Sequence, residues 1–268
     1  MSILDEIVEN KRREIEAAKA TRPLSRLKEE AGSRVVARRP FGRLFNTQRV
    51  LIAEIKPKSP SGGTLIGRSS IDDVQGKLLE TADLYAKSGA DAISVLTDEK
   101  YFGGSLTLLQ EVRARVPQAI LRKDFILDEY QVYESLLAGA DAYLLIAAIL
   151  PSEELRRLQG LGTSLGMDCL VEVHDEDDLA EALGMDAAII GINNRDLRTL
   201  ETNVAVTERL MRHIPQGNFV VSESGIETAE EVRRVRALGI RGILVGTSIL
   251  RSPDPLEKIK ELKDALHG

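Results

Sequence analysis

The feature that most constrains the fold is an alternation of short apolar runs with amphipathic segments of helical period. From residue 50 onward, apolar runs of four to six residues recur, each followed by a loop and a segment with apolar residues three or four positions apart. Parallel strands need crossover connections, so this alternation predicts an α/β fold with a parallel sheet. The length of 268 residues suits a (β/α)₈ TIM barrel, which typically takes about 250.

Eight strands and eight helices are expected after the N-terminal region. The strands are expected at residues 51–55, 92–96, 120–123, 142–146, 169–173, 187–192, 219–223 and 242–245. The helices are expected at residues 74–87, 106–115, 130–137, 153–165, 179–183, 204–213, 229–238 and 255–266. A doubly wound open sheet would alternate in the same way, but no dinucleotide-type glycine loop follows the first strand.

An internal repeat supports the barrel. Gly89, Gly139, Gly184 and Gly239 each stand between the end of an expected helix and an apolar strand, at intervals of 45 to 55 residues. Glycine favours the left-handed position that closes a helix, and about two βα units fit each interval.

A helical extension, residues 1–48, precedes the repeating part of a single domain that covers residues 1–268. Ser2 and Asp5 form a capping-box pattern, and apolar residues such as Leu4 and Ile7 then recur at helical spacing. Pro23 is expected to open a second short helix. The fold class expected is therefore α/β, a TIM barrel with additional N-terminal helices.

The composition excludes several classes of function. A net charge of −6 and a pI near 5.4 argue against a nucleic-acid or anionic-membrane surface. Cys169 is the single cysteine, so neither an internal disulfide nor a cysteine-cluster metal site is expected. Residues 1–20 are too charged for a signal peptide or membrane span. We expect a cytoplasmic protein, a monomer in preference to an oligomer, that binds a phosphorylated small molecule.

The first expected strand changes from apolar to ionic along one face. Ile52, Glu54 and Lys56 share that face because strand side chains alternate, and Pro57 and Pro60 end the ladder just beyond them. Two buried opposite charges are costly unless they are paired or used. The pattern is typical of an active-site strand, and an edge strand with a solvated polar face is the alternative.

Charged and amide side chains also stand at the ends of other expected strands. They are Lys123, Glu172, Asn193, Arg195 and Glu223. The carboxyl ends of barrel strands and the loops after them form the active site of such folds. With Glu54 and Lys56, the sequence predicts three carboxylates and two ammonium groups around one mouth.

An anion site is expected beside them. Ser224-Gly225 follows the seventh strand and Gly246-Thr247 follows the eighth, where barrels often bind phosphate with backbone N–H groups and a short helix. The alternative is that both glycines only turn the chain. Phe102 and Phe125 follow other strands, where they serve either as walls for a planar ring or as loop anchors. Glu172 and His174 share a strand face, but His213 and His267 lie elsewhere and no metal site is expected.

Several motifs resemble those of the indole-3-glycerol phosphate synthase family, in order over nearly the whole chain. They are ILDEI (3–7), AEIK (53–56), SPS (59–61), LTDEKYFGGSL (96–106), RKDFI (122–126), VEVH (171–174), GINNRDL (191–197), SESGI (222–226) and LVG (244–246). The resemblance implies a barrel enzyme of tryptophan biosynthesis that uses neither metal nor organic cofactor. It would close 1-(2-carboxyphenylamino)-1-deoxyribulose 5-phosphate to an indole with loss of CO₂ and water.

The resemblance also implies roles for individual residues. Lys123 would donate the proton to the ketone oxygen, Lys56 with Arg195 would hold the leaving carboxylate, and Glu172 and Glu54 are the candidate acid and base of dehydration. The remaining residues implied in the site are Asn193 and Glu223 for orientation, Phe102, Phe125 and Leu144 beside the ring, Ser224, Gly225, Gly246 and Thr247 at the phosphate, Ser59 and Pro60 in the first loop, and Leu197 at the substrate. Thr247 departs from the serine or acidic residue familiar at that position.

Two alternative functions are considered. Phosphoribosylanthranilate isomerase resembles this chain in expected fold, but that family uses a cysteine and an aspartate, whereas Cys169 lies within the fifth strand. The other rival is a non-catalytic phosphosugar-binding protein, for which so many charged groups would be needless.

Overall fold

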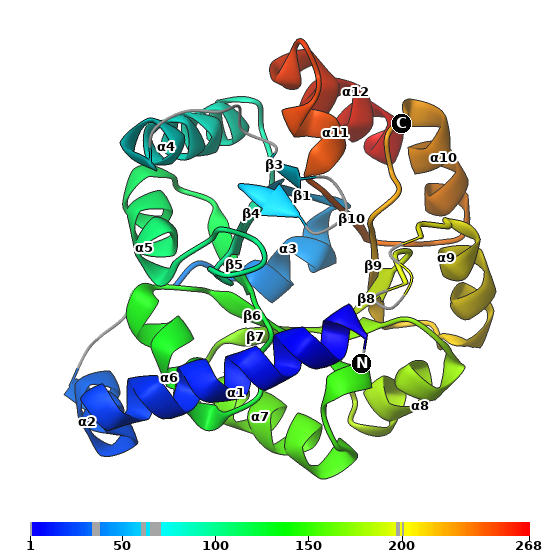
Figure 1. The fold of residues 1–268 in the computed structure, drawn as a ribbon. Coiled ribbons are helices and arrows are strands. Elements are labelled where there is room, and N and C mark those ends of the chain that lie inside the picture. Colours follow the sequence, from blue (N-terminus) through cyan, green and yellow to red (C-terminus); the bar gives the residue numbers. More distant parts are fainter. Residues whose placement is uncertain (1, 34–37, 60–62, 65–70, 197–198, 200) are drawn as a thin grey trace.

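A closed ring of parallel strands lies at the centre of the molecule (Figure 1). The computed structural model describes residues 2–33, 38–59, 63–64, 71–196, 199 and 201–268. Among them, the barrel strands are β1 (Val50–Ile55), β4 (Ala92–Leu96), β5 (Ala119–Lys123), β6 (Ala142–Ile146), β7 (Asp168–Val173), β8 (Ile189–Asn193), β9 (Phe219–Glu223) and β10 (Gly242–Val245). Neighbours in sequence pair in parallel, and β10 pairs with β1 to close the ring. The expected TIM barrel is confirmed.

Helices surround the ring on its outer face (Figure 1). Those after β1 are α4 (Ile71–Lys87), α5 (Leu106–Arg115), α6 (Glu129–Ala138), α7 (Ser152–Ser164), α8 (Glu176–Gly184), α9 (Ala205–Leu210), α10 (Ala229–Ala237), α11 (Thr247–Leu250) and α12 (Pro255–His267), with the 3₁₀ turns η1 (Ala147–Ile149) and η2 (Met211–His213). A two-stranded hairpin, β2 (Lys58–Ser59) with β3 (Gly63–Thr64), stands apart from the barrel sheet. No helix of the described ranges is long and apolar enough to cross a membrane.

The core has two layers because strand side chains alternate between faces. Outward-facing residues such as Leu51 and Ile93 pack against the surrounding helices. Inward-facing residues such as Ile52, Leu121 and Leu170 fill the barrel. The strands are therefore buried on both faces, which explains their nearly continuous apolar sequences.

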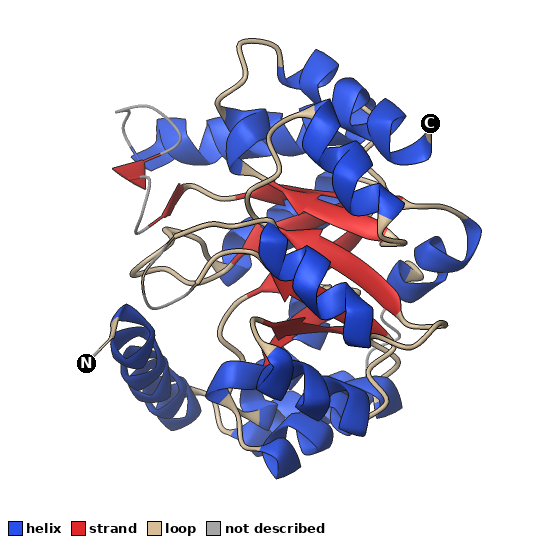
Figure 2. Cartoon of the chain, turned by 90° about the vertical axis from the view of Figure 1, so that its right-hand side faces the viewer, coloured by secondary structure: helices blue, strands red, loops and turns tan. Residues whose placement is uncertain are grey.

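Three helices precede the barrel strands, and the first and third of them cover its two ends (Figure 1). They are α1 (Ile3–Thr21), α2 (Leu24–Ser33) and α3 (Phe41–Thr47). Phe45 of α3 stacks on Phe219 at the start of β9, with ring centroids 5.7 Å apart, and so covers the amino-terminal end. Figure 1 shows α1 crossing in front of the ring, and Figure 2 shows it on the same side of the molecule as β2 and β3. The Ser2–Asp5 capping box at the start of α1 is present as expected.

Some expected boundaries are wrong. β8 begins at Ile189, not at residue 187, because the Ala187 N–H bonds back to the Ala182 carbonyl at the end of α8. The helix expected at 179–183 begins earlier, at Glu176, because the Asp175 side chain caps it. The helix expected at 204–213 ends at Leu210 and continues as a 3₁₀ turn. α3 and the β2–β3 hairpin were not expected.

Candidate active site

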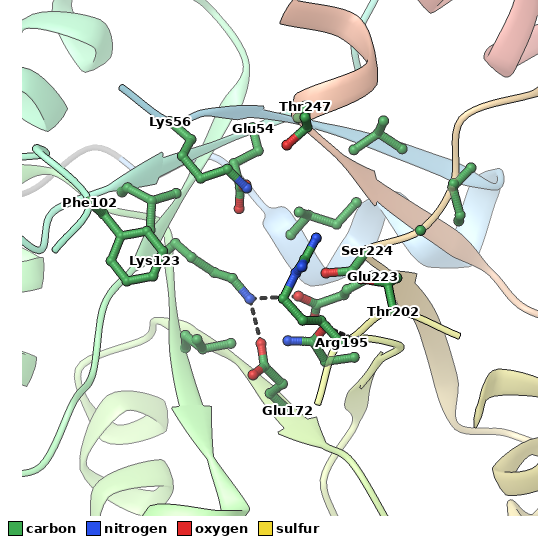
Figure 3. A pocket seen from close by; sticks show the side chains of 18 of the residues that line it. Glu54, Lys56, Phe102, Lys123, Glu172, Arg195, Thr202, Glu223, Ser224 and Thr247 are labelled. Atoms are coloured by element: carbon green, nitrogen blue, oxygen red, sulfur yellow. Dashed lines mark hydrogen bonds and ion pairs between the residues drawn. The ribbon is translucent and has the colours of Figure 1, made fainter. Parts of the chain in front are cut away.

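A cavity of about 470 Å³ lies at the carboxyl ends of the barrel strands (Figure 3). Its volume lies in the range of small-molecule sites. Fourteen of the predicted site residues line it: Glu54, Lys56, Phe102, Lys123, Phe125, Leu144, Glu172, Asn193, Arg195, Glu223, Ser224, Gly225, Gly246 and Thr247. Ser59 lies in β2, and its side chain falls outside the described part of the chain, as do Pro60 and Leu197.

Lys123 stands between two carboxylates at the base of this cavity (Figure 3). Its Nζ atom donates to Glu172 Oε2 at 2.5 Å and to Glu223 Oε2 at 2.6 Å. The three side chains come from the carboxyl-terminal ends of β5, β7 and β9 and face inward at the same end of the barrel. We call Lys123, Glu172 and Glu223 the Lys123 cluster.

The environment separates the pKa values of the two glutamates. Burial opposes ionisation of Glu172, but Lys123 and His174 outweigh it and hold the pKa of Glu172 well below its usual range. Burial raises the pKa of Glu223 to about 7, since the nearby charges of Glu172 and Glu54 offset part of the help from Lys123. Burial would lower the pKa of Lys123, yet the carboxylates raise it above its usual value. In this cluster Lys123 therefore stays protonated, Glu172 stays ionised, and the pKa of Glu223 lies near neutrality.

A second ion pair stands at the end of β1. Lys56 Nζ donates to Glu54 Oε1 at 2.6 Å, and the Lys56 side chain is 18% exposed toward the cavity. Gly246 leaves room for this pair, because a Cβ there would lie 3.0 Å from the Cβ and Oε1 atoms of Glu54. The ionic face predicted for the first strand therefore exists and opens onto the cavity.

Glycine also decides where Glu223 can lie. A Cβ at Gly191 of β8 would fall 2.1 Å from Glu223 Oε1, so only glycine leaves that carboxylate its place. Asn193, two residues along the same face, accepts the backbone N–H of Arg195 at 3.0 Å through its side-chain oxygen. The sequence pattern identified Asn193 but gave no sign that Gly191 was needed.

Backbone turns form the side of the cavity beside β9 and β10. Ser224 has a φ of 64° and Gly225 a φ of 73°, and Asn194 Nδ2 donates to the Ser224 carbonyl at 3.0 Å. A left-handed serine is uncommon and points to a functional constraint. Thr247 begins α11 directly after Gly246, so its N–H and hydroxyl are available to an anion.

An apolar wall stands opposite. The rings of Phe102 and Phe125 lie 6.0 Å apart, and Leu144 lines the cavity near them. The first turns of α1 add Ile3, Leu4 and Ile7. A planar aromatic ligand group would fit such a wall.

Comparison with known proteins assigns the family. A family model described as indole-3-glycerol phosphate synthase matches residues 4–262. The chain belongs to the indole-3-glycerol phosphate synthase family. Among its relatives are the indole-3-glycerol phosphate synthases of Albidiferax ferrireducens, 44% identical with 97% of each chain covered, and of Dehalococcoides mccartyi, 45% identical with 97% of this chain and 99% of the relative covered. The activity is therefore that of a carboxy-lyase of tryptophan biosynthesis, acting on a phosphorylated substrate.

Solved structures agree on the fold. 3-Hexulose-6-phosphate synthase from Salmonella typhimurium superposes with a TM-score of 0.65 at 14% identity, covering 81% of this chain and 98% of that one. At such identity the likeness shows the barrel alone. The isomerase alternative is not the family that matches, and Cys169 lies at the opposite end of β7 from the cavity.

Several residues that line the cavity of this synthase fold were not predicted from the sequence. Thr202, Ile226 and Arg251 line the cavity, as do the α1 residues Leu4 and Ile7. The periodicity of α1 marked Leu4 and Ile7 as apolar-face positions, but not what that face would cover. Arg251, one turn beyond Gly246, was the available signal for a further cation.

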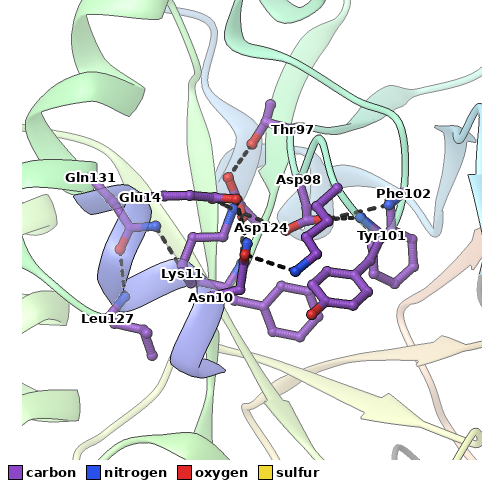
Figure 4. A network of polar contacts seen from close by, with 12 residues as sticks. Asn10, Lys11, Glu14, Thr97, Asp98, Tyr101, Phe102, Asp124, Leu127 and Gln131 are labelled. Carbon is purple, nitrogen blue, oxygen red and sulfur yellow. Dashed lines mark hydrogen bonds and ion pairs between the residues drawn. The ribbon is translucent and has the colours of Figure 1, made fainter. Parts of the chain in front are cut away.

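A second buried lysine fixes α1 above the cavity (Figure 4). Lys11 Nζ lies 2.7 Å from Glu14 Oε2, 3.0 Å from Asp98 Oδ2 and 3.1 Å from Asp124 Oδ1. We call these four residues the Lys11 cluster. Burial would lower the pKa of Lys11, but the carboxylates raise it above its usual value.

The two aspartates of the Lys11 cluster also shape the loops after β4 and β5. Asp98 Oδ1 accepts the backbone N–H groups of Tyr101 and Phe102 at 2.8 and 3.2 Å (Figure 4). Asp124 Oδ1 accepts the N–H of Phe125 at 2.8 Å. Both aromatic residues of the cavity wall are thus held by carboxylates that bind α1.

Metal ligands are not grouped in the part of the chain that the structure describes. No set of three or more His, Cys, Asp or Glu side chains there is arranged to hold a metal ion. The polar groups of the site are instead paired ammonium and carboxylate groups.

Proposed function

We propose that the cavity binds 1-(2-carboxyphenylamino)-1-deoxyribulose 5-phosphate and that the residues named above convert it to indole-3-glycerol phosphate, CO₂ and water. The observation that carries the assignment of roles is the position of Lys123 Nζ, 2.5 and 2.6 Å from two buried carboxylates at the base of the cavity. We further propose that residues 1–268 work as one domain, with residues 1–48 as its helical extension. The expected cytoplasmic location and monomeric state stay predictions.

Lys123 is the proton donor for ring closure. When the ring carbon that carries the carboxylate attacks the ketone carbon, negative charge develops on the ketone oxygen. Lys123 is protonated and fixed by Glu172 and Glu223, so it can meet that charge without prior rearrangement. A group held in place by two short contacts supplies the required orientation.

Lys56 holds the carboxylate that leaves as CO₂. Its ammonium group is paired with Glu54 at the wall of the cavity where β1 ends. Arg195 lines the cavity too and supplies a second cation for the same group. Charge neutralisation fixes the carboxylate until carbon–carbon cleavage releases it.

Dehydration then needs an acid for the departing hydroxyl and a base for the proton lost on aromatisation. Glu172 suits the base, because its neighbours keep it ionised. Glu54, paired with Lys56 at the end of β1, is the candidate acid for the departing hydroxyl. Glu223 and Asn193 orient the substrate hydroxyls.

The remaining wall residues bind the two ends of the substrate. Backbone and hydroxyl groups of Ser224, Gly225, Gly246 and Thr247 bind the phosphate, with Arg251 nearby as a cation. Phe102, Phe125 and Leu144 pack against the aromatic ring. In this proposed arrangement the ketone lies between the two ends, beside Lys123.

Purified protein mixed with this substrate should generate the fluorescence of the indole product. Saturable binding without turnover would instead favour a phosphosugar-binding protein. A Glu172→Gln variant should bind substrate with unchanged affinity and lose most turnover. Unchanged turnover in Glu172→Gln would contradict the role proposed for Glu172.

A further inference from the structure

We propose that His174 is a positioning residue that acts through Glu172, fixing its orientation and keeping it ionised. The inference rests on the role proposed above for Glu172. His174 is not among the residues that line the cavity, so it does not meet the substrate. It lies two residues beyond Glu172, so its side chain is on the same face of the chain.

The imidazole of His174 lies between two carboxylates. Its Nε2 atom is 3.3 Å from Glu172 Oε1, and its Nδ1 atom is 3.2 Å from Asp178 Oδ2. The His174 side chain is 14% exposed, and those of Glu172 and Asp178 are 2% and 11% exposed. The contact with Glu172 is an ion pair and not an aligned hydrogen bond.

Asp178 has little freedom to move away. Its Oδ2 atom also accepts the backbone N–H of His174 at 2.9 Å. Its own N–H donates to Asp175 Oδ1 at 2.9 Å, the hydrogen bond that caps α8. The start of α8 therefore holds the carboxylate that holds the imidazole.

This geometry favours the doubly protonated ring. A neutral imidazole has one donor and one acceptor nitrogen, so between two carboxylates its acceptor would face an anionic oxygen. The imidazolium can donate to Asp178 and presents positive charge to Glu172. Burial would lower the pKa of His174, but Asp178 and Glu172 outweigh it and raise the pKa to about 10.

Other charges near His174 leave this balance intact. Arg209 of α9 donates to the His174 carbonyl at 3.4 Å, and its guanidinium is paired with Glu176 at 3.2 Å. Lys123 stands on the far side of Glu172. The charges of Asp178, His174, Glu172 and Lys123 thus alternate in sign from the start of α8 to the cavity.

The consequence is that each oxygen of Glu172 has its own cation. Oε2 accepts from Lys123 and Oε1 faces His174. Without His174, Glu172 could rotate away from Lys123 and would take up a proton at a higher pH. His174 therefore maintains the base that dehydration needs, although it never touches the substrate.

Kinetics of a His174→Gln variant test the role. We expect kcat to fall about tenfold with KM changed less than twofold, and the acidic limb of the kcat profile to move to higher pH. His213→Gln, an exposed histidine in η2, is the matched control and should leave all three unchanged. Unchanged kcat and pH profile in His174→Gln would overturn the inference.

A measurement without activity covers the case in which His174→Gln does not fold. In ¹⁵N NMR spectra of the wild-type protein, both ring nitrogens of His174 should remain protonated at pH 8, and Asp178→Asn should lower the titration midpoint. A neutral His174 at pH 8 would refute the inference. If His174 is charged but Glu172→Gln keeps full turnover, the proposed function fails instead, so the two failures are distinguishable.

Discussion

The Lys123 cluster and the Lys11 cluster each consist of a buried lysine and several carboxylates, but they differ in the other contacts that their carboxylate oxygens make. Each holds a buried lysine within about 3 Å of carboxylates from different strand ends. In the Lys11 cluster, Asp98 and Asp124 also accept backbone N–H groups of the loops that follow. In the Lys123 cluster, whose three residues line the cavity, Glu223 Oε1 is buried without a hydrogen-bond partner. Asp98 Oδ2 of the Lys11 cluster also lacks an aligned hydrogen bond, but it faces Lys11 Nζ at 3.0 Å.

This contrast separates a structural ion cluster from a catalytic one. Carboxylate oxygens that already face a cation or an N–H group hold elements together, and their charges are not available to a substrate. A carboxylate with an open oxygen at a cavity wall has capacity left for a ligand. Buried charge alone therefore does not mark the active site, whereas an unfilled polar atom at a cavity wall does.

Lys11→Met should have the largest effect on stability. It leaves Asp98, Asp124 and Glu14 without their shared cation, and breaking such a buried ion pair costs about 3–5 kcal/mol. Urea unfolding should show this loss. Lys19→Met, on the same helix but more exposed and paired with Asp128, is the control and should change stability by less than about 1 kcal/mol. Equal losses of stability in the two variants would contradict the structural role of the Lys11 cluster.

Lys123→Ala should lower turnover and leave the fold intact, the reverse of what is expected for Lys11→Met. We expect turnover to fall at least about 100-fold because a proton donor and a charge partner of the transition state are lost. The fold should persist, since Glu223 can take up a proton when the cation is gone. Steady-state kinetics and circular dichroism check both parts, and turnover close to that of the wild type would refute the assigned role.

Gly191→Ala tests whether the placement of Glu223 matters. The added Cβ would lie 2.1 Å from Glu223 Oε1 and displace the carboxylate, so we expect kcat to fall about tenfold. Gly160→Ala is the control, because a Cβ there meets nothing within 4 Å. If both variants keep full turnover, the position of Glu223 does not limit the reaction.

Glu223→Gln should have the smallest effect, a gain in stability at high pH. The folded-state pKa of Glu223, about 7, lies above its ordinary value of 4.5. Its contribution to stability is therefore complete below pH 4.5 and is lost as the pH rises through 7. The free energy of unfolding of the variant relative to the wild type should be higher at pH 8 than at pH 4.5. Stability curves that stay parallel would contradict this.

The sequence predicted the barrel and most of the cavity because both follow from the order of strands and helices and from the alternation of side chains along each strand. Strand alternation located Lys123, Glu172 and Glu223 on inward faces, and parallel pairing brought them to one rim. The Lys11 cluster could not be predicted in this way, since Lys11 meets Asp98 and Asp124 only after α1 crosses the barrel mouth. Gly191 escaped notice because its role depends on the shape of a neighbouring strand's side chain.

The turnover of Lys123→Arg tests the central claim most directly. Arginine keeps the positive charge beside Glu172 and Glu223 but does not give up its proton in proteins. If Lys123 acts by donating a proton, turnover at saturating substrate should fall at least about 100-fold while substrate still binds. Turnover within a few fold of the wild type would mean that charge alone suffices, and proton donation by Lys123 would be contradicted.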